Sequence, residues 1–311
     1  MAGTLDLVDS FAIVPVPPFR LDFTAWAIRR RAHNLVDLWD GMAYHRAALI
    51  GDSIVELEVR QVGPTLAPTL KIRVWGDTGT RVPRGEVRGQ VEKILGTSIN
   101  LTGFYRIARE DPQLWVLTKR FRGMKPPRFP SVYEALVNGI ACQQLSLIVG
   151  IMLLNRLALA CSLTSAGGAW HGHPFPRPQD VIQMGEGGLK DIGFSKMKAR
   201  ALLGLSEMVL NGDLDLSRLE HLSSSEVVKE LDALPGIGRW TAEYVLLRGL
   251  PPLDVFPGDD VGARNRLRRF LNRHKPMDYD DVARVTKRWQ PYAGVVYFHL
   301  LLLGLTEAGI L

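Results

Sequence analysis

The sequence predicts an α+β N-terminal domain with an antiparallel sheet over residues 1–100, and a larger, all-helical domain over residues 101–311. Two observations support this division. Residues 54–60 and 70–75 alternate apolar and charged side chains, which is the pattern of a half-buried strand. After Thr102 the alternation fades, and apolar residues follow helical spacing to the end of the chain.

Helical spacing also occurs within the N-terminal domain, over residues 23–40 and 86–96. Strands and helices together in so short a stretch are typical of a small α+β unit. The C-terminal domain is predicted to hold helices over residues 101–121, 132–161, 179–192, 196–211, 223–234, 239–249, 261–274, 279–288 and 294–305. Good N-cap residues precede several of them, namely Ser131, Ser195, Ser223 and Asp278.

The long apolar stretch 132–161 is interrupted by the sequence CQQLS. Two glutamines are awkward inside an apolar helix. One interpretation is a break, with Ser146 capping a second helix and Gln143 and Gln144 brought to a surface end. The alternative is a single kinked helix in the core.

Composition narrows the class of protein. The 311 residues are 46% hydrophobic and 23% charged, with a net charge of +6, and the sequence pI is about 9.4. This balance is typical of a globular chain, and it favours a polyanionic partner. The two cysteines, Cys142 and Cys161, are too few for a disulfide framework, a four-cysteine zinc site or a cysteine-ligated iron–sulfur cluster. We expect no metal site.

The N-terminal sequence MAGTLDLVDS carries two aspartates and does not resemble a signal peptide. The most apolar run, residues 145–154, is too short to span a bilayer. We therefore expect a cytoplasmic protein with no membrane partner, associated with the nucleoid if the source is prokaryotic.

The most specific motif is LPGIGRWTAEY, residues 234–244. Gly236 and Gly238 permit positive φ and let another backbone approach, and the next helix offers unpaired N–H groups at the positive end of its dipole. This turn suits an extended anion such as a phosphodiester. A tight helix–helix connection without a ligand is the alternative from these residues alone.

The motif and its neighbours resemble the helix–hairpin–helix DNA glycosylases, specifically the bacterial 3-methyladenine DNA glycosylase II branch. The resemblance rests on Leu234–Gly238 with Thr241 and Ala242, followed by the sequence DVFPGDD. It continues through YEALVNGIACQQLS, GFSKMKARAL and RWQPYAGVVYFHLL, and so covers about residues 100–311. The resemblance implies that the helical domain is a glycosylase domain, and that the hairpin grips the backbone of double-stranded DNA. The implied backbone contacts are Pro235, Gly236, Ile237, Gly238, Arg239 and Thr241, with Lys196 at a second phosphate site.

The family places an essential aspartate just beyond the hairpin, and the resemblance assigns this role to Asp260, with Asp259 in support. A carboxylate there stabilises the positive charge that builds on the sugar as a base departs. One of the two aspartates could instead cap the helix that begins near Val261.

Bifunctional relatives carry an attacking lysine at the position of Trp240, and Arg239 cannot replace it. The resemblance therefore implies a monofunctional enzyme that uses water. Trp240 and Tyr244 lie four residues apart on one helix face and are implied to line the base pocket, where they would attract a cationic alkylated purine. A pocket tryptophan of the family is replaced by Leu301, with Tyr292 and Tyr297 nearby. Core packing is the alternative for these aromatic residues.

The CQQLS break matches the position of the family's wedge, which fills the gap left by an extruded base. Gln144 is the candidate wedge, with Gln143 and Leu145 as neighbours. We expect a monofunctional glycosylase that removes damaged, N-alkylated purines from duplex DNA by base flipping. It would act as a monomer and require no cofactor, although the family's hairpin carbonyls can hold Na⁺ or K⁺. The alternatives are excision of oxidised guanine, hypoxanthine or uracil, or damage binding without catalysis.

Overall fold

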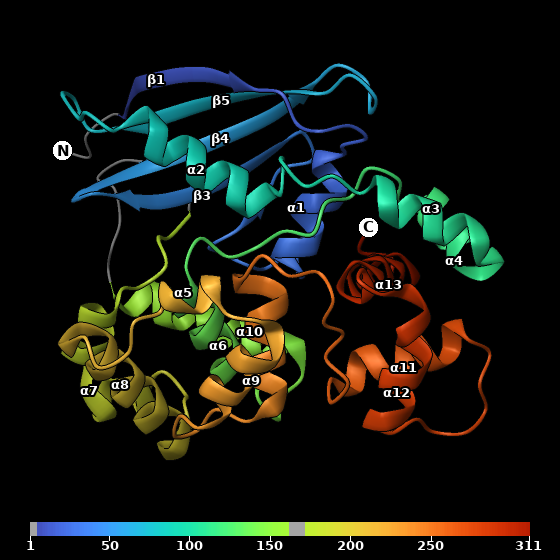
Figure 1. Cartoon of the computed structure of the whole chain (residues 1–311). Helices are drawn as coiled ribbons and strands as arrows, with labels where there is room; N and C mark the ends of the chain where they lie inside the picture. The colour runs from blue at the N-terminus through green and yellow to red at the C-terminus, as the bar shows by residue number, and fades with distance from the viewer. Residues whose placement is uncertain (1–4, 162–171) are drawn as a thin grey trace.

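The computed structural model describes residues 5–161 and 172–311 (Figure 1). One antiparallel sheet with the strand order β1-β5-β4-β3-β2 lies in the N-terminal part. Within that sheet, β5 shows the predicted alternation, because Leu70, Ile72 and Val74 are buried while Lys71 and Arg73 are exposed. The strands are β1 (Asp6–Ile13), β2 (Leu38–Trp39), β3 (Ala43–Ile50), β4 (Ser53–Val62) and β5 (Thr69–Gly76).

Both strands predicted from alternation are present, as β4 and β5. The sequence pattern missed β3, because seven of its eight residues are buried and no polar face marks it. In the sheet, β3 pairs with β4 along its whole length, from Ala43 opposite Arg60 to Ile50 opposite Ser53.

The helix predicted over residues 23–40 was too long. Helix α1 (Leu21–Arg29) ends at Arg30, whose φ of 63° is left-handed. The Asn34 side chain then organises the following turn, because its oxygen accepts hydrogen bonds from the backbone N–H groups of Val36 and Asp37. Such local side-chain bonds compete with helix formation, so the chain turns into β2 instead. Helix α2 (Arg84–Leu95) matches its prediction and lies across the sheet (Figure 1).

The predicted helices of the C-terminal part are all present; two of the predicted stretches each form two helices, and α7 is kinked at Gly185. The stretch 101–121 breaks at Asp111, which caps the second helix ahead of Pro112. The stretch 132–161 breaks at CQQLS, and the Ser146 hydroxyl accepts from the Val149 N–H, as one interpretation predicted. The helices are α3 (Thr102–Glu110), α4 (Pro112–Arg120), α5 (Val132–Cys142), α6 (Leu147–Ala160), α7 (Pro178–Asp191), α8 (Lys196–Asn211), α9 (Ser224–Asp232), α10 (Arg239–Gly249), α11 (Val261–Phe270), α12 (Tyr279–Thr286) and α13 (Ala293–Glu307).

Two clusters of buried apolar side chains hold the molecule together. The first cluster joins the sheet and helix α2 to the helices from α5 to α10. The second cluster joins helices α3 and α4 to helices α11 and α13. Helix α10 contributes to both, through Leu246 in the first and Leu247 in the second. Figure 1 shows the two helical groups beneath the sheet, and the chain crosses from one to the other between α10 and α11. That crossing carries Asp259 and Asp260.

Candidate active site

The hairpin joins α9 to α10, and its two glycines do different things. Gly236 has a φ of +79°, and a Cβ there would lie 2.7 Å from the Ala201 Cβ of α8. Only glycine fits both conditions. Gly238 caps α10 in an extended conformation, with φ −109°, and a Cβ there would meet nothing within 4 Å. Open space therefore lies beside the first turn of α10, whose N–H groups have no partner within the helix.

Gln143 fastens the α5–α6 junction to the hairpin. Its Nε2 donates to the Gly236 carbonyl at 2.8 Å and to the Thr241 hydroxyl at 2.9 Å. The amide of Gln143 is therefore engaged with the hairpin, and Gln144 remains the candidate wedge. Gln144 is exposed and has a left-handed φ of 54°.

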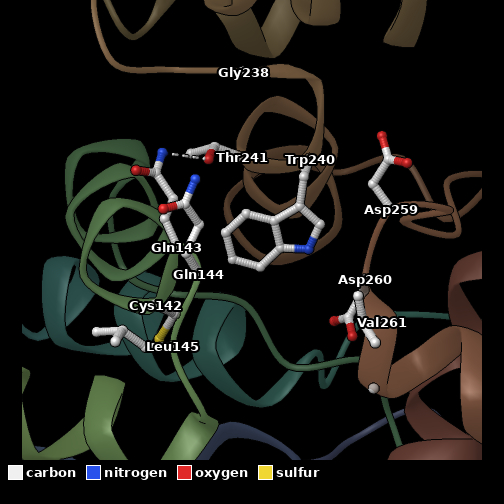
Figure 2. Close-up of a pocket in the computed structure, with 11 residues that line it drawn as sticks. Cys142, Gln143, Gln144, Leu145, Gly238, Trp240, Thr241, Asp259, Asp260 and Val261 are labelled. Atoms are coloured by element: carbon white, nitrogen blue, oxygen red, sulfur yellow. Dashed lines mark hydrogen bonds between the residues drawn. The ribbon is translucent and has the colours of Figure 1, made fainter.

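An outer cavity of about 630 Å³ opens between the hairpin, the CQQLS break and the start of α11. Figure 2 shows Trp240 in its centre, with the two glutamines on one side and the two aspartates on the other. The carboxylate of Asp260 points into the cavity, and that of Asp259 points away from it (Figure 2). The sequence-predicted catalytic carboxylate and pocket tryptophan therefore share one cavity.

Asp260 caps a helix and also lines the cavity. Its Oδ1 accepts from the Ala263 N–H at 2.7 Å, so it is the N-cap of α11. Its Oδ2 accepts from the hydroxyl of Tyr297 on α13 at 3.1 Å. The two bonds hold the carboxylate in one orientation at the cavity wall.

The loop that carries Asp260 is fixed to α10 by a second set of contacts. Arg239 pairs with Asp259 at 2.7 Å, and its guanidinium lies 3.7 Å from the ring centre of Tyr279. One layer deeper, Glu243 accepts from the Tyr279 hydroxyl at 2.6 Å and from the Gly258 N–H at 3.3 Å. Burial raises the pKa of Glu243. Arg239, predicted to contact DNA, is thus half-exposed and ion-paired to the loop.

An inner cavity of about 310 Å³ continues from the outer one and shares Trp240 and Asp260 with it. The rings of Trp240 and Tyr244 lie 5.6 Å apart at 31°, so the predicted aromatic pair forms. Leu301 and Tyr297 line the same cavity. Burial is the main cause that raises the pKa of Tyr244.

Of three further predicted site residues, one lies away from the cavities and two are buried in the hairpin. Tyr292 precedes α13, packs 6.0 Å from the ring of Phe104 and lines neither cavity, because its side chain belongs to the second apolar cluster. Ile237 and Thr241 are only 6% and 1% exposed. Their side chains support the hairpin from inside, so only their backbone groups remain for a contact with DNA.

Lys196 lies in a groove of about 470 Å³ between the start of α8 and the hairpin, opposite Pro235 and Gly236. It is exposed. The neighbouring Lys198 is engaged with the end of α5, where its Nζ donates to the carbonyls of Ala141 and Gln143.

Sequence reasoning missed four arginines that line the inner cavity: Arg30, Arg31, Arg248 and Arg266. Arg30 is brought there from the N-terminal part and donates at 2.7 Å to the Tyr244 hydroxyl and at 2.7 Å to Asn138. Two signals were available: Arg248 is a charged residue within an otherwise apolar turn of α10, and Arg266 belongs to an arginine-rich run directly after Asp260. In the described ranges, no group of three or more potential metal-ligating side chains occurs, and no helix is long and apolar enough to cross a membrane.

These features define a class: a helical protein in which a glycine hairpin precedes a cavity containing a fixed carboxylate. Residues 137–291 match the family model described as HhH-GPD superfamily base excision DNA repair protein. The protein belongs to this superfamily through that segment, and it is a DNA glycosylase of the HhH-GPD type.

Comparison with individual proteins agrees with this. DNA-3-methyladenine glycosylase of Bacillus subtilis is 27% identical over 224 residues, which are 70% of this chain and 73% of the relative. Among solved structures, 3-methyladenine DNA-glycosylase from Archaeoglobus fulgidus superposes with a TM-score of 0.79 at 23% identity, covering 94% of this chain and 97% of the other. An 8-oxoguanine glycosylase/lyase of Clostridium acetobutylicum, in complex with double-stranded DNA, gives 0.76 at 16% identity and covers both chains fully.

Proposed function

We propose that this protein is a monofunctional DNA glycosylase, which hydrolyses the N-glycosidic bond of a damaged purine flipped out of duplex DNA. The main observation in support of this proposal is the position of Asp260, whose carboxylate points into a cavity that also contains Trp240 (Figure 2). Its roles would be to stabilise positive charge on the sugar and to orient the attacking water.

The identity of residue 240 supports hydrolysis by water. A lyase of this fold needs an amine that attacks C1′, and tryptophan has none. Among the described residues that line the outer and inner cavities, none is a lysine. The nearby Lys198 donates to two main-chain carbonyls and faces α5.

The hairpin and the glutamine break support the base-flipping part of the proposal. Gly238 leaves space beside the unpaired N–H groups of α10, where a DNA phosphate can bind without base readout. Lys196 offers a cationic contact in the groove beside Pro235 and Gly236. Gln144 stands exposed at the mouth of the cavity, where a wedge must enter the base stack.

Damaged purines are the lesion class that the names of the relatives indicate, N-alkylated purines among them. A purine that enters the cavities would stack on Trp240, which is partly exposed and lines both of them.

Two measurements test the proposal. Duplexes with a single damaged purine are incubated with enzyme and then cleaved at abasic sites by mild alkali. Asp260→Asn is expected to lower the single-turnover rate by about a hundredfold or more. Asp259→Asn, which removes the neighbouring charge, should retain most activity. Equal rates for Asp260→Asn and the wild-type protein contradict the assignment.

The second measurement is borohydride trapping. A monofunctional enzyme forms no Schiff base with DNA, so no covalent adduct is expected during turnover. A trapped adduct contradicts the water mechanism, even if Asp260 proves essential.

A further inference from the structure

The inner cavity is strongly basic. Asp260 is the single carboxylate among its lining residues. Four arginines line it: Arg30, Arg31, Arg248 and Arg266. Two buried acids, Asp37 and Glu134, are already paired with Arg46 at 2.7 and 2.6 Å, and Asp259 is paired with Arg239 at 2.7 Å. The cavity therefore keeps an excess of positive charge where a flipped base would sit.

Two of the arginines contact Tyr244, the aromatic residue that would otherwise attract a cation. Arg30 donates to the Tyr244 hydroxyl at 2.7 Å, and the guanidinium carbon of Arg248 lies 5.6 Å from the centre of the Tyr244 ring. The hydroxyl and the ring of Tyr244 thus both face cations of the protein itself. The expectation that Tyr244 attracts a cationic alkylated base does not fit this arrangement, because a third cation would be added beside two.

The other two arginines have no partner among the described residues. The side chains of Arg31 and Arg266 form no hydrogen bond or ion pair there, and the Nε of each is buried and unpaired. Burial first, and then the charges of Arg266 and Arg30, lower the pKa of Arg31. Arg266 extends over two glycines, because a Cβ at Gly304 would touch its Cδ at 2.8 Å and one at Gly262 would lie 3.6 Å from Nη1. Both guanidinium groups therefore line the cavity without being engaged by another side chain.

The charge of the departing base determines whether guanidinium donors stabilise it in the transition state. When a neutral purine is released, the C1′–N9 bond breaks and its electron pair stays on the base, which then carries negative charge. Water adds its oxygen to C1′, and the proton that it loses ends on the base, so the released purine is neutral. Guanidinium donors stabilise the anionic base in the transition state. A purine that is already cationic leaves as a neutral molecule, gains nothing from these donors and is repelled when it enters.

We propose that the inner cavity selects electrically neutral damaged purines bearing a carbonyl oxygen over purines made cationic by N-alkylation, with Arg31 and Arg266 as the specificity-determining residues. This inference rests on the glycosylase activity proposed above, and it states which damaged purines that activity prefers. A bidentate guanidinium suits the oxygen and nitrogen acceptors on the edge of such a base.

The test compares two duplexes that differ only in the lesion, hypoxanthine or 7-methylguanine. Both bases carry a carbonyl at C6, but only the second is cationic. Single-turnover rates are divided by the rate of uncatalysed release from the same duplex. We expect the larger acceleration for hypoxanthine. A larger acceleration for 7-methylguanine overturns the inference and leaves the proposed function standing, whereas no release of either lesion contradicts both.

Variants separate specificity from structure. Arg266→Met is expected to lower the hypoxanthine rate by about tenfold to a hundredfold while leaving the 7-methylguanine rate unchanged or higher. Arg31→Met should act in the same direction, and Arg266→Lys should partly restore the hypoxanthine rate. Arg269→Met is the control, because it removes the same charge from an exposed position on α11. A proportional loss on both lesions in Arg266→Met and in Arg31→Met, with unchanged melting temperatures, overturns the inference.

Discussion

The hydroxyl of Tyr297 on α13 donates a 3.1 Å hydrogen bond to Oδ2 of Asp260, the N-cap of α11. This contact joins the two helices at the cavity wall. Burial, followed by the charge of Asp260, raises the pKa of Tyr297, so the phenol stays protonated and remains a donor at neutral pH.

Tyr297→Phe removes this donor and keeps the ring. The carboxylate would then be held by the cap bond to Ala263 alone. We expect kcat to fall about tenfold with little change in KM, because the carboxylate acts in the transition state and loses its orientation. Stability should fall by only about 0.5–1.5 kcal/mol, as for one hydrogen bond. Steady-state kinetics and thermal melting check this, and an unchanged kcat would show that the bond does not position Asp260 for catalysis.

The two hairpin glycines form a matched pair of substitutions. Gly236→Ala places a Cβ 2.7 Å from Ala201 at a φ of +79°, so we expect a loss of stability of about 1 kcal/mol or more. Gly238→Ala meets no atom within 4 Å and should melt close to the wild-type protein. Its Cβ nevertheless fills the space beside the first turn of α10, so we expect weaker binding to duplex DNA. Calorimetric melting and fluorescence anisotropy with labelled DNA separate the two effects, and wild-type affinity in Gly238→Ala contradicts the phosphate site.

The two glutamines are expected to differ in the same way. Gln144→Ala should slow release of a damaged base from duplex DNA by about tenfold and leave release from single strands unchanged, because only the duplex requires unstacking. Gln143→Ala removes the hydrogen bonds to Gly236 and Thr241 and should weaken the hairpin itself. Rates on matched duplex and single-stranded substrates measure this. Equal losses on both substrates in Gln144→Ala would argue against a wedge.

His299 predicts an acid sensitivity of folding. It is fully buried on α13, and its Nδ1 lies 2.9 Å from the Val295 carbonyl oxygen, with which it forms a hydrogen bond. Burial lowers the pKa of His299 to about 4. In the unfolded chain its pKa is about 6.5, so between these values the unfolded state binds more protons. The stabilising contribution is therefore present above pH 6.5 and is lost as the pH falls to 4, by about 3 kcal/mol.

Melting temperatures between pH 7 and pH 4.5 check this. His299→Leu should flatten the dependence on pH, whereas His274→Gln, which changes an exposed histidine, should preserve it. An equally steep decline in His299→Leu would assign the acid sensitivity to other groups.

Local sequence patterns predicted some elements of the fold correctly and missed others, depending on whether neighbouring residues mark the element. Local signals were reliable for the strand alternation in β4 and β5, and of the two interpretations of CQQLS the break with a serine cap on α6 is confirmed. Local signals failed where an element has no polar face, as in β3, or where a side chain redirects the chain, as Asn34 does after α1. The division of α3 from α4 was also missed, although Asp111 and Pro112 mark it.

The sequence by itself determined the hairpin, the carboxylate that follows it and a tryptophan in place of a nucleophilic lysine, because these are fixed by neighbouring residues and short spacings. The tertiary structure decided the surroundings of that carboxylate. It brought Arg30 to Tyr244 across 214 positions and engaged Gln143 with the hairpin, and it placed Tyr297 on Asp260. Such contacts depend on how packed helices meet, and local periodicity carries no record of which distant side chains will share one cavity.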